Sequence, residues 1–376
     1  MISQRYKNDG AALRRLNEIQ LQAKADILEK VRTGIYIYEV SRCPVCGDVD
    51  FELLSEKDRY GLYFPVCACR RCGLVQTNPR MNQESYGQFY CDDYRRLYGG
   101  VLCPSAEWVR RQIWRGRVLL NRIKSECHWP NSLNEYCVID VGCGAGGLLK
   151  PFHDHGAAVR GYDLGELYVE YGIEQLGLDL RIGGIRSESE AEAADLIIYA
   201  HVLEHILDLP DELQEIWRVL KPDGLFYLEM PGLRNLTQSY NMDYLDLMQN
   251  AHTYHFTMQS LDNIMLQNGF ERVCGDESIR AIYRKKKSGC IPAEWVSDYP
   301  QIIKELKRIE TLRRILPFAP YRLSKWGRKK KIAIIGRCEQ VYYKCREVAK
   351  SLLSRVGIYN HVYRVHKYIM RRGAKW

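Results

Sequence analysis

The chain has 376 residues, 46% of them hydrophobic, which allows two or three domains and a sizeable core. No segment approaches the run of ~20 apolar residues that spans a bilayer, and the polar N-terminus lacks the apolar stretch of a signal peptide. The net charge of +9 is unevenly placed: residues 281–376 hold 25 Lys+Arg and 6 Asp+Glu, whereas the first 280 hold 30 and 40. We therefore expect a cytoplasmic protein with a mildly acidic body and a basic extension that attracts anions.

Four of the 14 cysteines form two C-x2-C pairs, Cys43 with Cys46 and Cys69 with Cys72. Each pair places two thiolates on one turn, and two such turns complete a tetrahedral zinc site with Zn–S distances of ~2.3 Å. Cys67 is excluded, because choosing it would break the second pair. Since four thiolates leave no open coordination position, we predict a structural zinc ion that nucleates a small module.

A tyrosine-rich stretch follows the second cysteine pair. Tyr90, Tyr94 and Tyr98 are spaced by four residues, so they share one face if this stretch is helical. Such a stripe is more often packing, which is the default interpretation. The functional alternative is a lid whose phenol groups face the cofactor or the substrate.

The most informative segment is residues 138–147, V-I-D-V-G-C-G-A-G-G. An apolar strand over 136–141 ends in a D-x-G-x-G-x-G turn and enters a predicted helix over 148–155. Glycines are needed in such a turn because the backbone bends tightly and a ligand lies against bare peptide groups. Asp163, about 20 residues further on at the end of the next predicted strand, is placed to bind a ribose hydroxyl pair. The pattern predicts a nucleoside-containing cofactor.

Asp140, directly before the glycines, narrows the choice of cofactor. A carboxylate there repels the pyrophosphate of a dinucleotide but suits the ammonium and sulfonium groups of S-adenosylmethionine (SAM). Together with H-V-L-E-H at 201–205 and R-V-L-K-P-D-G at 218–224, the region 134–285 resembles class I SAM-dependent methyltransferases. An NAD-binding domain is the alternative, since Asp163 suits it too. The residues that the resemblance assigns to the cofactor are Asp140, Gly142, Cys143, Gly144, Gly146, Asp163, Leu164 and His201.

The remaining elements of this region fit a doubly wound α/β fold with a seven-stranded, Rossmann-like sheet. We expect strands over 195–200 and 225–230, a helix over 211–220, a helix over 260–268 with Ser260 as its N-cap, and a terminal hairpin of 270–274 and 279–284.

Histidines and one glutamate are the candidates for chemistry. Methyl transfer needs an aligned nucleophile and, for a hydroxyl or a carbon next to a ketone, a base. Glu204 and His205 follow a strand at the carboxyl edge of the sheet, and His252 and His255 follow the next strand near the same edge. In the favoured interpretation, His205 or His255 is the general base and Glu204 polarises it.

Two alternatives remain for this group. Glu204, His205 and a later histidine could bind a divalent metal, as in the similar E-x-x-E-H pattern of quinone-ring and small-RNA 2′-O-methyltransferases, although His201 stands where that pattern has its first acid. L-E-H is also frequent in class I methyltransferases as a turn that contacts the cofactor.

The acceptor is suggested by a second resemblance. The cysteine pairs, residues 72–80 and the tyrosines of 86–98 are similar to the N-terminal part of zinc-containing methyltransferases of deoxysugar and surface-polysaccharide synthesis. The resemblance implies a sugar or nucleotide-sugar substrate, methylated in several members at the carbon next to a keto group. The alternatives are a metal-assisted O-methyltransferase of a quinone or an RNA 2′-hydroxyl, and a non-catalytic SAM-binding scaffold at a membrane.

The expected domain order ends in a basic extension. Solvated helical faces are its default interpretation, but Trp326 and Trp376 stand in basic runs, which fits peripheral binding to the anionic inner membrane surface. Nucleic acid is a weaker alternative, because no recognisable module is present. The expected parts are a helical segment (1–40), the zinc module (41–85), a helical lid or linker (86–133), the SAM domain (134–285) and a mainly helical basic extension (286–376).

Overall fold

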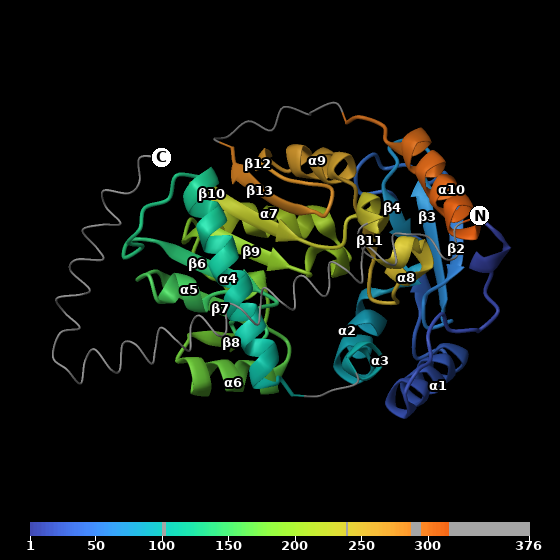
Figure 1. The fold of residues 1–376 in the computed structure, drawn as a ribbon, viewed down its shortest axis with the longest axis horizontal. Coiled ribbons are helices and arrows are strands. Elements are labelled where there is room, and N and C mark those ends of the chain that lie inside the picture. Colours follow the sequence, from blue (N-terminus) through green and yellow to red (C-terminus); the bar gives the residue numbers. More distant parts are fainter. Residues whose placement is uncertain (100–102, 238–239, 287–294, 316–376) are drawn as a thin grey trace. The chain divides into compact units, whose positions relative to one another are not determined.

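The computed structural model describes residues 1–99, 103–237, 240–286 and 295–315 (Figure 1). The basic runs around Trp326 and Trp376 lie outside these ranges. Within the described ranges, none of the helices combines the length and apolarity that crossing a bilayer requires. Two sheets dominate this part of the chain, one of seven strands and one of four.

The seven-stranded sheet has the order β12-β13-β10-β9-β6-β7-β8, as expected for the predicted α/β fold. Strands β6 to β10 are parallel to their neighbours, and β13 runs antiparallel between β10 and β12. The predicted terminal hairpin is confirmed. The strands are β6 Cys137–Val141, β7 Ala158–Asp163, β8 Leu180–Ile182, β9 Ala194–Ala200, β10 Leu220–Glu229, β12 Phe270–Cys274 and β13 Arg280–Lys285.

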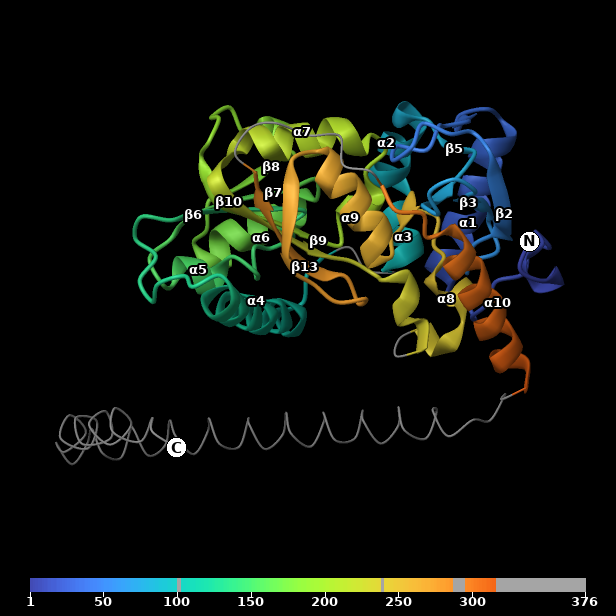
Figure 2. The same ribbon diagram turned by 90° about the horizontal axis from the view of Figure 1, so that it is seen from above.

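Helices cover both faces of this sheet (Figure 2). Val138 and Ile198 pack on the face that buries α4, α5 and α6, whereas Ile139 and Ile197 pack on the face that buries α7 and α9. Neighbouring residues of one strand thus enter opposite cores, as the two-residue period of a strand requires. The helices are α4 Ala106–Glu126, α5 Lys150–His153, α6 Glu166–Leu176, α7 Leu209–Val219 and α9 Met258–Gln267.

Three predicted helix starts differ from the structure. The helix expected over 211–220 is α7, which begins at Leu209 because the Asp208 side chain caps it. The helix expected over 148–155 is only α5, because the chain stays in turns up to Leu149 after the glycines. The helix α9 is capped by Thr257 rather than Ser260: the Thr257 hydroxyl accepts from the Ser260 amide at 3.1 Å, and the Ser260 hydroxyl accepts from the Thr257 amide at 3.0 Å. The first amides of a helix have no acceptor within the helix backbone, and this reciprocal pair supplies acceptors for two of them. The helix therefore begins upstream of the predicted position.

The four-stranded sheet joins segments that are far apart in sequence. Three strands come from the region of the cysteines, and the fourth, β11 (Tyr254–His255), follows the seven-stranded sheet's β10 in the chain. In Figure 1 β11 lies beside β4, and Tyr254 pairs with Gln76 and His255 with Val75. The N-terminal module is therefore completed by a strand from the region 134–285. Its own strands are β2 Phe51–Lys57, β3 Tyr63–Cys69 and β4 Val75–Thr77.

Helix α10 (Tyr299–Ile315), which follows the SAM region in sequence, also packs on the module. Ile302 and Leu306 are buried in one cluster with Leu54 and Phe64 of β2 and β3. The same cluster includes side chains of α8 (Tyr244–Leu247) and the short helices η1 (Gln4–Tyr6) and η4 (Leu233–Thr237).

The tyrosine-rich stretch is two helices rather than one. Helix α2 (Gln83–Asp92) ends at Asp93, which is fully buried, and α3 (Tyr94–Tyr98) follows. The Asp93 carboxylate accepts from Lys30 Nζ at 2.8 Å and from Tyr36 Oη at 2.6 Å. These bonds tie the break between α2 and α3 to the helix α1. The elements of this region are α1 Glu18–Arg32, β1 Tyr38–Glu39 and β5 Arg80–Met81.

Candidate active site

The glycine turn after β6 is tightly covered by other elements. Gly142, Gly144 and Gly146 have φ angles of +70°, +55° and +71°, a region that glycine enters without steric cost. A Cβ at Gly142 would lie 2.4 Å from Val202 Cγ2, and a Cβ at Gly144 would lie 3.0 Å from Trp108 Cη2. Both the backbone angles and the close neighbours therefore require glycine. The predicted residue Cys143 is buried beneath this turn.

Asp140, at the end of β6, is fully buried, and neither oxygen of its carboxyl group receives a hydrogen bond from the described residues. Burial raises the pKa of Asp140 well above its usual range, and the nearby charge of Asp163 acts in the same direction. An unpartnered buried carboxyl group lacks the compensation that such groups normally have. A cationic group at this point would supply it, so Asp140 fits the ammonium of SAM.

Asp163 lies at the end of β7, as predicted, beside the glycine turn. Its Oδ2 accepts from the Gly144 amide at 2.8 Å, and its Oδ1 accepts from the Gly165 amide at 2.7 Å. Arg95 of α3 approaches Oδ1 at 3.4 Å. Asp163 thus fixes the turn, and Oδ2, which accepts a single hydrogen bond from the described residues, keeps a lone pair for a ribose hydroxyl. The predicted neighbour Leu164 is 70% exposed.

His201 follows β9 with a φ of +64°, a strained value for a residue with a side chain. Its amide donates to the Glu229 carbonyl at 2.7 Å, which fixes this conformation. Its Nδ1 lies 3.5 Å from Glu204 Oε1. Burial lowers the pKa of His201, but the adjacent Glu204 side chain, together with the charge of Glu229, outweighs burial and raises it above the ordinary value.

His205 occupies the short helix η3 (Leu203–His205), and its ring contacts two oxygen atoms. Nδ1 lies 2.9 Å from the Ala251 carbonyl oxygen and 2.6 Å from Tyr90 Oη. Because a carbonyl only accepts, we assign the proton to Nδ1. The lone pair is then on Nε2, which lies 3.9 Å from Glu204 Oε1. Burial lowers the pKa of His205, although Glu204 acts in the opposite direction, so the ring is neutral at neutral pH.

Glu204 is 2% exposed, and neither oxygen of its side chain receives a hydrogen bond from the described residues. Its backbone carbonyl accepts from the Thr253 amide at 2.8 Å, which ties η3 to the segment before β11. A carboxylate in this position would stabilise a positive charge on either neighbouring histidine.

The structure brings His252 to His205 but leaves His255 apart. The rings of His205 and His252 are 4.9 Å apart. Gln249 Oε1 accepts from Arg59, so its amide nitrogen donates to His252 Nε2, which leaves His252 neutral. His255 packs in β11 against the rings of Phe64 and Tyr244, and burial lowers its pKa to about 3. The His255 ring lies 5.9 Å from that of His252, so His255 reaches the described cluster only through His252 and not through Glu204 or His205.

The predicted tyrosine stripe persists across the break at Asp93. The ring centroids of Tyr90 and Tyr94 are 4.6 Å apart, and the parallel rings of Tyr94 and Tyr98 are 5.5 Å apart. Tyr90 and Tyr94 both lie 6.0 Å from the His205 ring, and Tyr98 is 51% exposed. The stripe therefore runs from the protein surface to the buried histidine.

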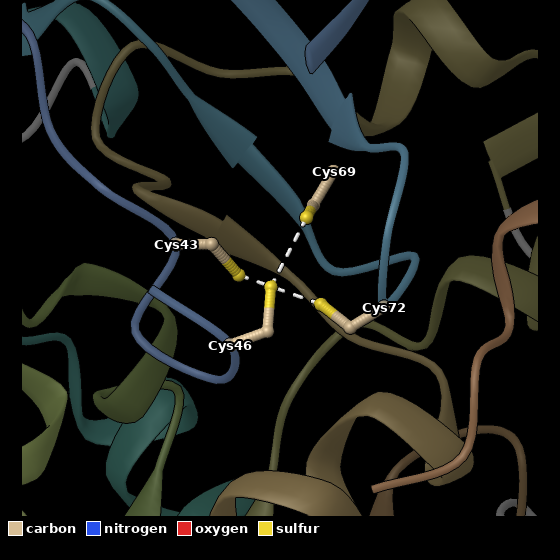
Figure 3. A group of neighbouring side chains, drawn as sticks. All are labelled: Cys43, Cys46, Cys69 and Cys72. Atoms are coloured by element: carbon tan, nitrogen blue, oxygen red, sulfur yellow. Dashed lines mark hydrogen bonds between the residues drawn. The ribbon is translucent and has the colours of Figure 1, made fainter. Parts of the chain in front are cut away.

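The four predicted cysteine ligands converge between the two turns (Figure 3). The sulfur atoms of Cys43 and Cys72, and those of Cys46 and Cys69, are 3.4 Å apart, and all four lie within 4.8 Å of one another. These separations are too long for disulfides and fit the edges of a tetrahedron around one ion. Cys67 points away and donates to the Asn78 carbonyl at 3.4 Å, so its exclusion is consistent with the geometry.

Sequence reasoning missed three residues near these groups: Arg95, Gln249 and Arg59. Each comes from a segment without a recognised motif, and each reaches the site through tertiary contacts. Tyr90, by contrast, could be singled out from the sequence, because it belongs to the tyrosines that are spaced by four residues.

Comparisons with known proteins agree with this geometry. A methyltransferase-domain family matches residues 111–274. A ubiquinone biosynthesis O-methyltransferase of Bradyrhizobium sp. (strain ORS 278) is 34% identical over 102 residues, which are 25% of this chain and 40% of that protein. A tRNA N(3)-cytidine methyltransferase, METTL2 of Gallus gallus, is 25% identical over 261 residues, covering 58% of this chain and 68% of that protein. The chain thus spans about two fifths of the length of the ubiquinone-pathway relatives it matches.

Among solved structures, the PH0226 protein from Pyrococcus horikoshii OT3 aligns with a TM-score of 0.40 at 20% identity, covering 52% of this chain and 99% of that one. The family match spans the glycine turn, Asp163 and the His201–His205 segment. Residues 111–274 form a class I SAM-dependent methyltransferase domain.

Proposed function

We propose that this protein transfers the methyl group of SAM to a sugar, either nucleotide-linked or part of a surface-glycan precursor, with His205 as the general base. The observation that carries the proposal is the orientation of His205: Nδ1 is held by Ala251 and Tyr90, which leaves the Nε2 lone pair free beside Glu204. A neutral imidazole with a lowered pKa accepts a proton at neutral pH, and the resulting charge is stabilised by Glu204.

SAM supplies an activated methyl group on a sulfonium, so the protein's residues need only bind, align and deprotonate. The glycine turn, Asp140 and Asp163 would hold the cofactor, with Asp140 at its ammonium and Asp163 at its ribose. His205 would take a proton from a hydroxyl or from a carbon next to a ketone, and the Ala251 carbonyl keeps the ring in the required tautomer.

A sugar acceptor is supported by the cysteine cluster and its resemblance to sugar methyltransferases. The four thiolate positions fit a structural zinc ion, whose closed coordination shell excludes a role in the reaction itself. Because β11 completes the module's sheet, the module holds His252 and the Ala251 carbonyl near the base. Peripheral membrane binding through the basic extension stays a prediction.

The test is mass spectrometry of nucleotide sugars and surface glycans from cells with and without the protein. We expect one sugar to lose a methyl-sized mass increment when the gene is absent. Expression of the wild-type protein in the deletion strain should restore the increment, and so should the control variant His153→Gln, which changes an exposed histidine. His205→Gln should not restore it. An unchanged sugar profile would contradict the sugar assignment, and product formation with any acceptor would exclude a non-catalytic scaffold.

A second candidate is metal-assisted O-methylation of a quinone or an RNA hydroxyl. Side-chain donor atoms of Glu204, His205 and His252 lie within 4.8 Å of one another, and relatives include proteins named as ubiquinone O-methyltransferases and a tRNA methyltransferase. The amide of Gln249 already donates to His252 Nε2, so an ion bound at that nitrogen would have to displace it, which argues against this candidate. Loss of a second bound metal in Glu204→Ala, with the cysteine-bound ion retained, would favour this candidate.

A further inference from the structure

Arg59 is a partly buried cation without a carboxylate partner in the described part of the chain. It follows β2, and its guanidinium donates to three neutral oxygens: Tyr60 Oη at 3.0 Å, Gln249 Oε1 at 2.6 Å and the Asp246 carbonyl at 3.3 Å. The neighbouring Asp58 is fully buried and is occupied by three backbone amides. Burial raises the pKa of Asp58 to about 7, so this acid neutralises Arg59 only in part. Burial lowers the pKa of Arg59, but Tyr60, Tyr98 and Asp58 outweigh burial and raise it, so the guanidinium stays charged without an ion pair to any described residue.

Aromatic rings hold the Arg59 guanidinium in place. Its Cζ lies 5.0 Å from the Tyr60 ring centroid and 5.5 Å from that of Tyr98. Tyr98 is half exposed, and its stacking on Tyr94 connects it to the His205 ring. A guanidinium fixed on aromatic faces loses little further freedom when it binds an anion.

The cation is also connected to the base through hydrogen bonds. Gln249 is buried, accepts from Arg59 and donates to His252, whose ring lies 4.9 Å from that of His205. Arg59 is thus anchored to the same cluster as the base. A ligand that contacts both Arg59 and His205 would need an anionic end and a reactive end, with the tyrosines between them.

We infer that Arg59 and Tyr98 form a subsite for the phosphate or diphosphate of a phosphoryl-linked sugar acceptor, whose sugar ring lies along Tyr94 and Tyr90 with its reactive atom at His205. The inference rests on the proposed function and names its substrate class. The planar fork of arginine carries five N–H donors, and the bonds to Tyr60, Gln249 and the Asp246 carbonyl leave two of them, on Nε and Nη1, for an anion. A phosphate would also supply the counter-charge that Arg59 lacks. Sugar faces pack well on aromatic rings that offer area at low entropic cost.

The test measures binding by calorimetry, without methyl transfer, on the full chain loaded with S-adenosylhomocysteine. The probes are inorganic pyrophosphate, UDP and farnesyl diphosphate, and the variants are Arg59→Gln and Arg59→Lys, with Arg15→Gln as a matched control at an exposed arginine. We expect the wild-type protein and the control to bind alike, and Arg59→Gln to bind about 10- to 100-fold more weakly. Arg59→Lys should fall between them, because it keeps the charge and loses the fork.

Each outcome bears on the inference. Tighter binding of UDP than of pyrophosphate supports it with a nucleotide carrier, and tighter binding of farnesyl diphosphate supports it with a polyprenyl carrier. Absence of binding by all three probes, or equal binding by a folded Arg59→Gln variant, overturns the subsite. Methylation of an uncharged sugar by the wild-type protein as fast as of the same sugar in its phosphoryl-linked form also overturns it while leaving the proposed function intact. Failure of the proposed function would instead show as probe binding without any methylated sugar.

Discussion

The two sides of the candidate active site are assembled in different ways. The donor side, defined by Asp140, the glycines of 142–146 and Asp163, comes from two adjacent parallel strands and one turn. The acceptor side, defined by Tyr90, Glu204, His205 and His252, is assembled from three segments. Backbone hydrogen bonds and the pairing of β11 with β4 connect these segments to the module. One side is local in sequence and made largely of backbone, and the other depends on tertiary structure. Disruptions of tertiary packing should therefore damage the acceptor side first.

The largest effect should follow loss of the cysteine-bound ion. Cys69→Ser removes one of four ligands at the end of β3, so we expect β4 and β11 to lose order and activity to be abolished. Hydrogen exchange should become faster at Val75 and His255 but stay slow over Cys137–Val141, where the donor side begins. Cys67→Ser is the matched control, because Cys67 lies outside the cluster. Equal protection of β11 in both variants would show that the module does not hold the acceptor side.

His205→Gln tests the acceptor side alone. We expect kcat to fall by about 10²- to 10⁴-fold, the range for loss of a general base. The affinity for SAM should remain unchanged, because His205 contacts the donor side only through Glu204 and His201. Single-turnover kinetics and calorimetry measure the two quantities, with His153→Gln as the control. A full kcat in a folded His205→Gln variant would exclude His205 as the base.

Asp140→Asn tests the donor side. We expect SAM affinity to fall by about 10- to 100-fold, because one charge-assisted contact is lost. The thermal stability of the free protein should not decrease, since an unpartnered buried carboxyl group is replaced by an uncharged one of the same shape. A large loss of stability would show that Asp140 is compensated within the protein.

The raised pKa of Asp140 gives this variant a second readout. A carboxyl group that is protonated in the free protein must ionise to bind a cation, so SAM binding should release a proton and tighten as pH rises. Calorimetry in two buffers of different ionisation enthalpy measures the released proton. In Asp140→Asn the release should disappear.

The smallest effect should come from Glu204→Gln. Activity requires neutral His205, so kcat/KM of the wild type should rise with pH through a midpoint below the ordinary histidine value of ~6.5. Because Glu204 raises the pKa of His205, its removal should shift this midpoint further down. It should also lower kcat by about tenfold, since the charged imidazole loses its stabilising carboxylate. An unshifted pH profile would show that Glu204 does not influence the pKa of His205.

The contrast between the two sides also explains what the sequence could predict. The strand, the glycine turn and Asp163 are set by local backbone requirements, so their pattern predicted both the seven-stranded sheet and the donor side. The cysteine pairs were equally readable, because each pair lies on one turn. Local patterns with a strict steric or ligand requirement are visible in a single sequence.

The acceptor side was only partly predictable for the same reason. His252 was placed correctly near His205, but His255, three residues later, is held away by the pairing of β11 with β4. Arg59 and Gln249 are 190 positions apart in sequence, and no spacing rule connects them. The break at Asp93 likewise depends on Lys30 of α1 and on Tyr36, which follows that helix.

The strand that the catalytic region contributes to the module has a consequence for exchanging parts between relatives. A chimera that replaces only residues 41–85 would meet a foreign β11 at Gln76 and Val75. A successful exchange should carry the segment through Tyr254–His255 together with the module, because the two halves of this sheet must fit one another side chain by side chain. Substrate preference should therefore be transferred between relatives only when two separate segments, the N-terminal module and the later segment that contains β11, are exchanged together.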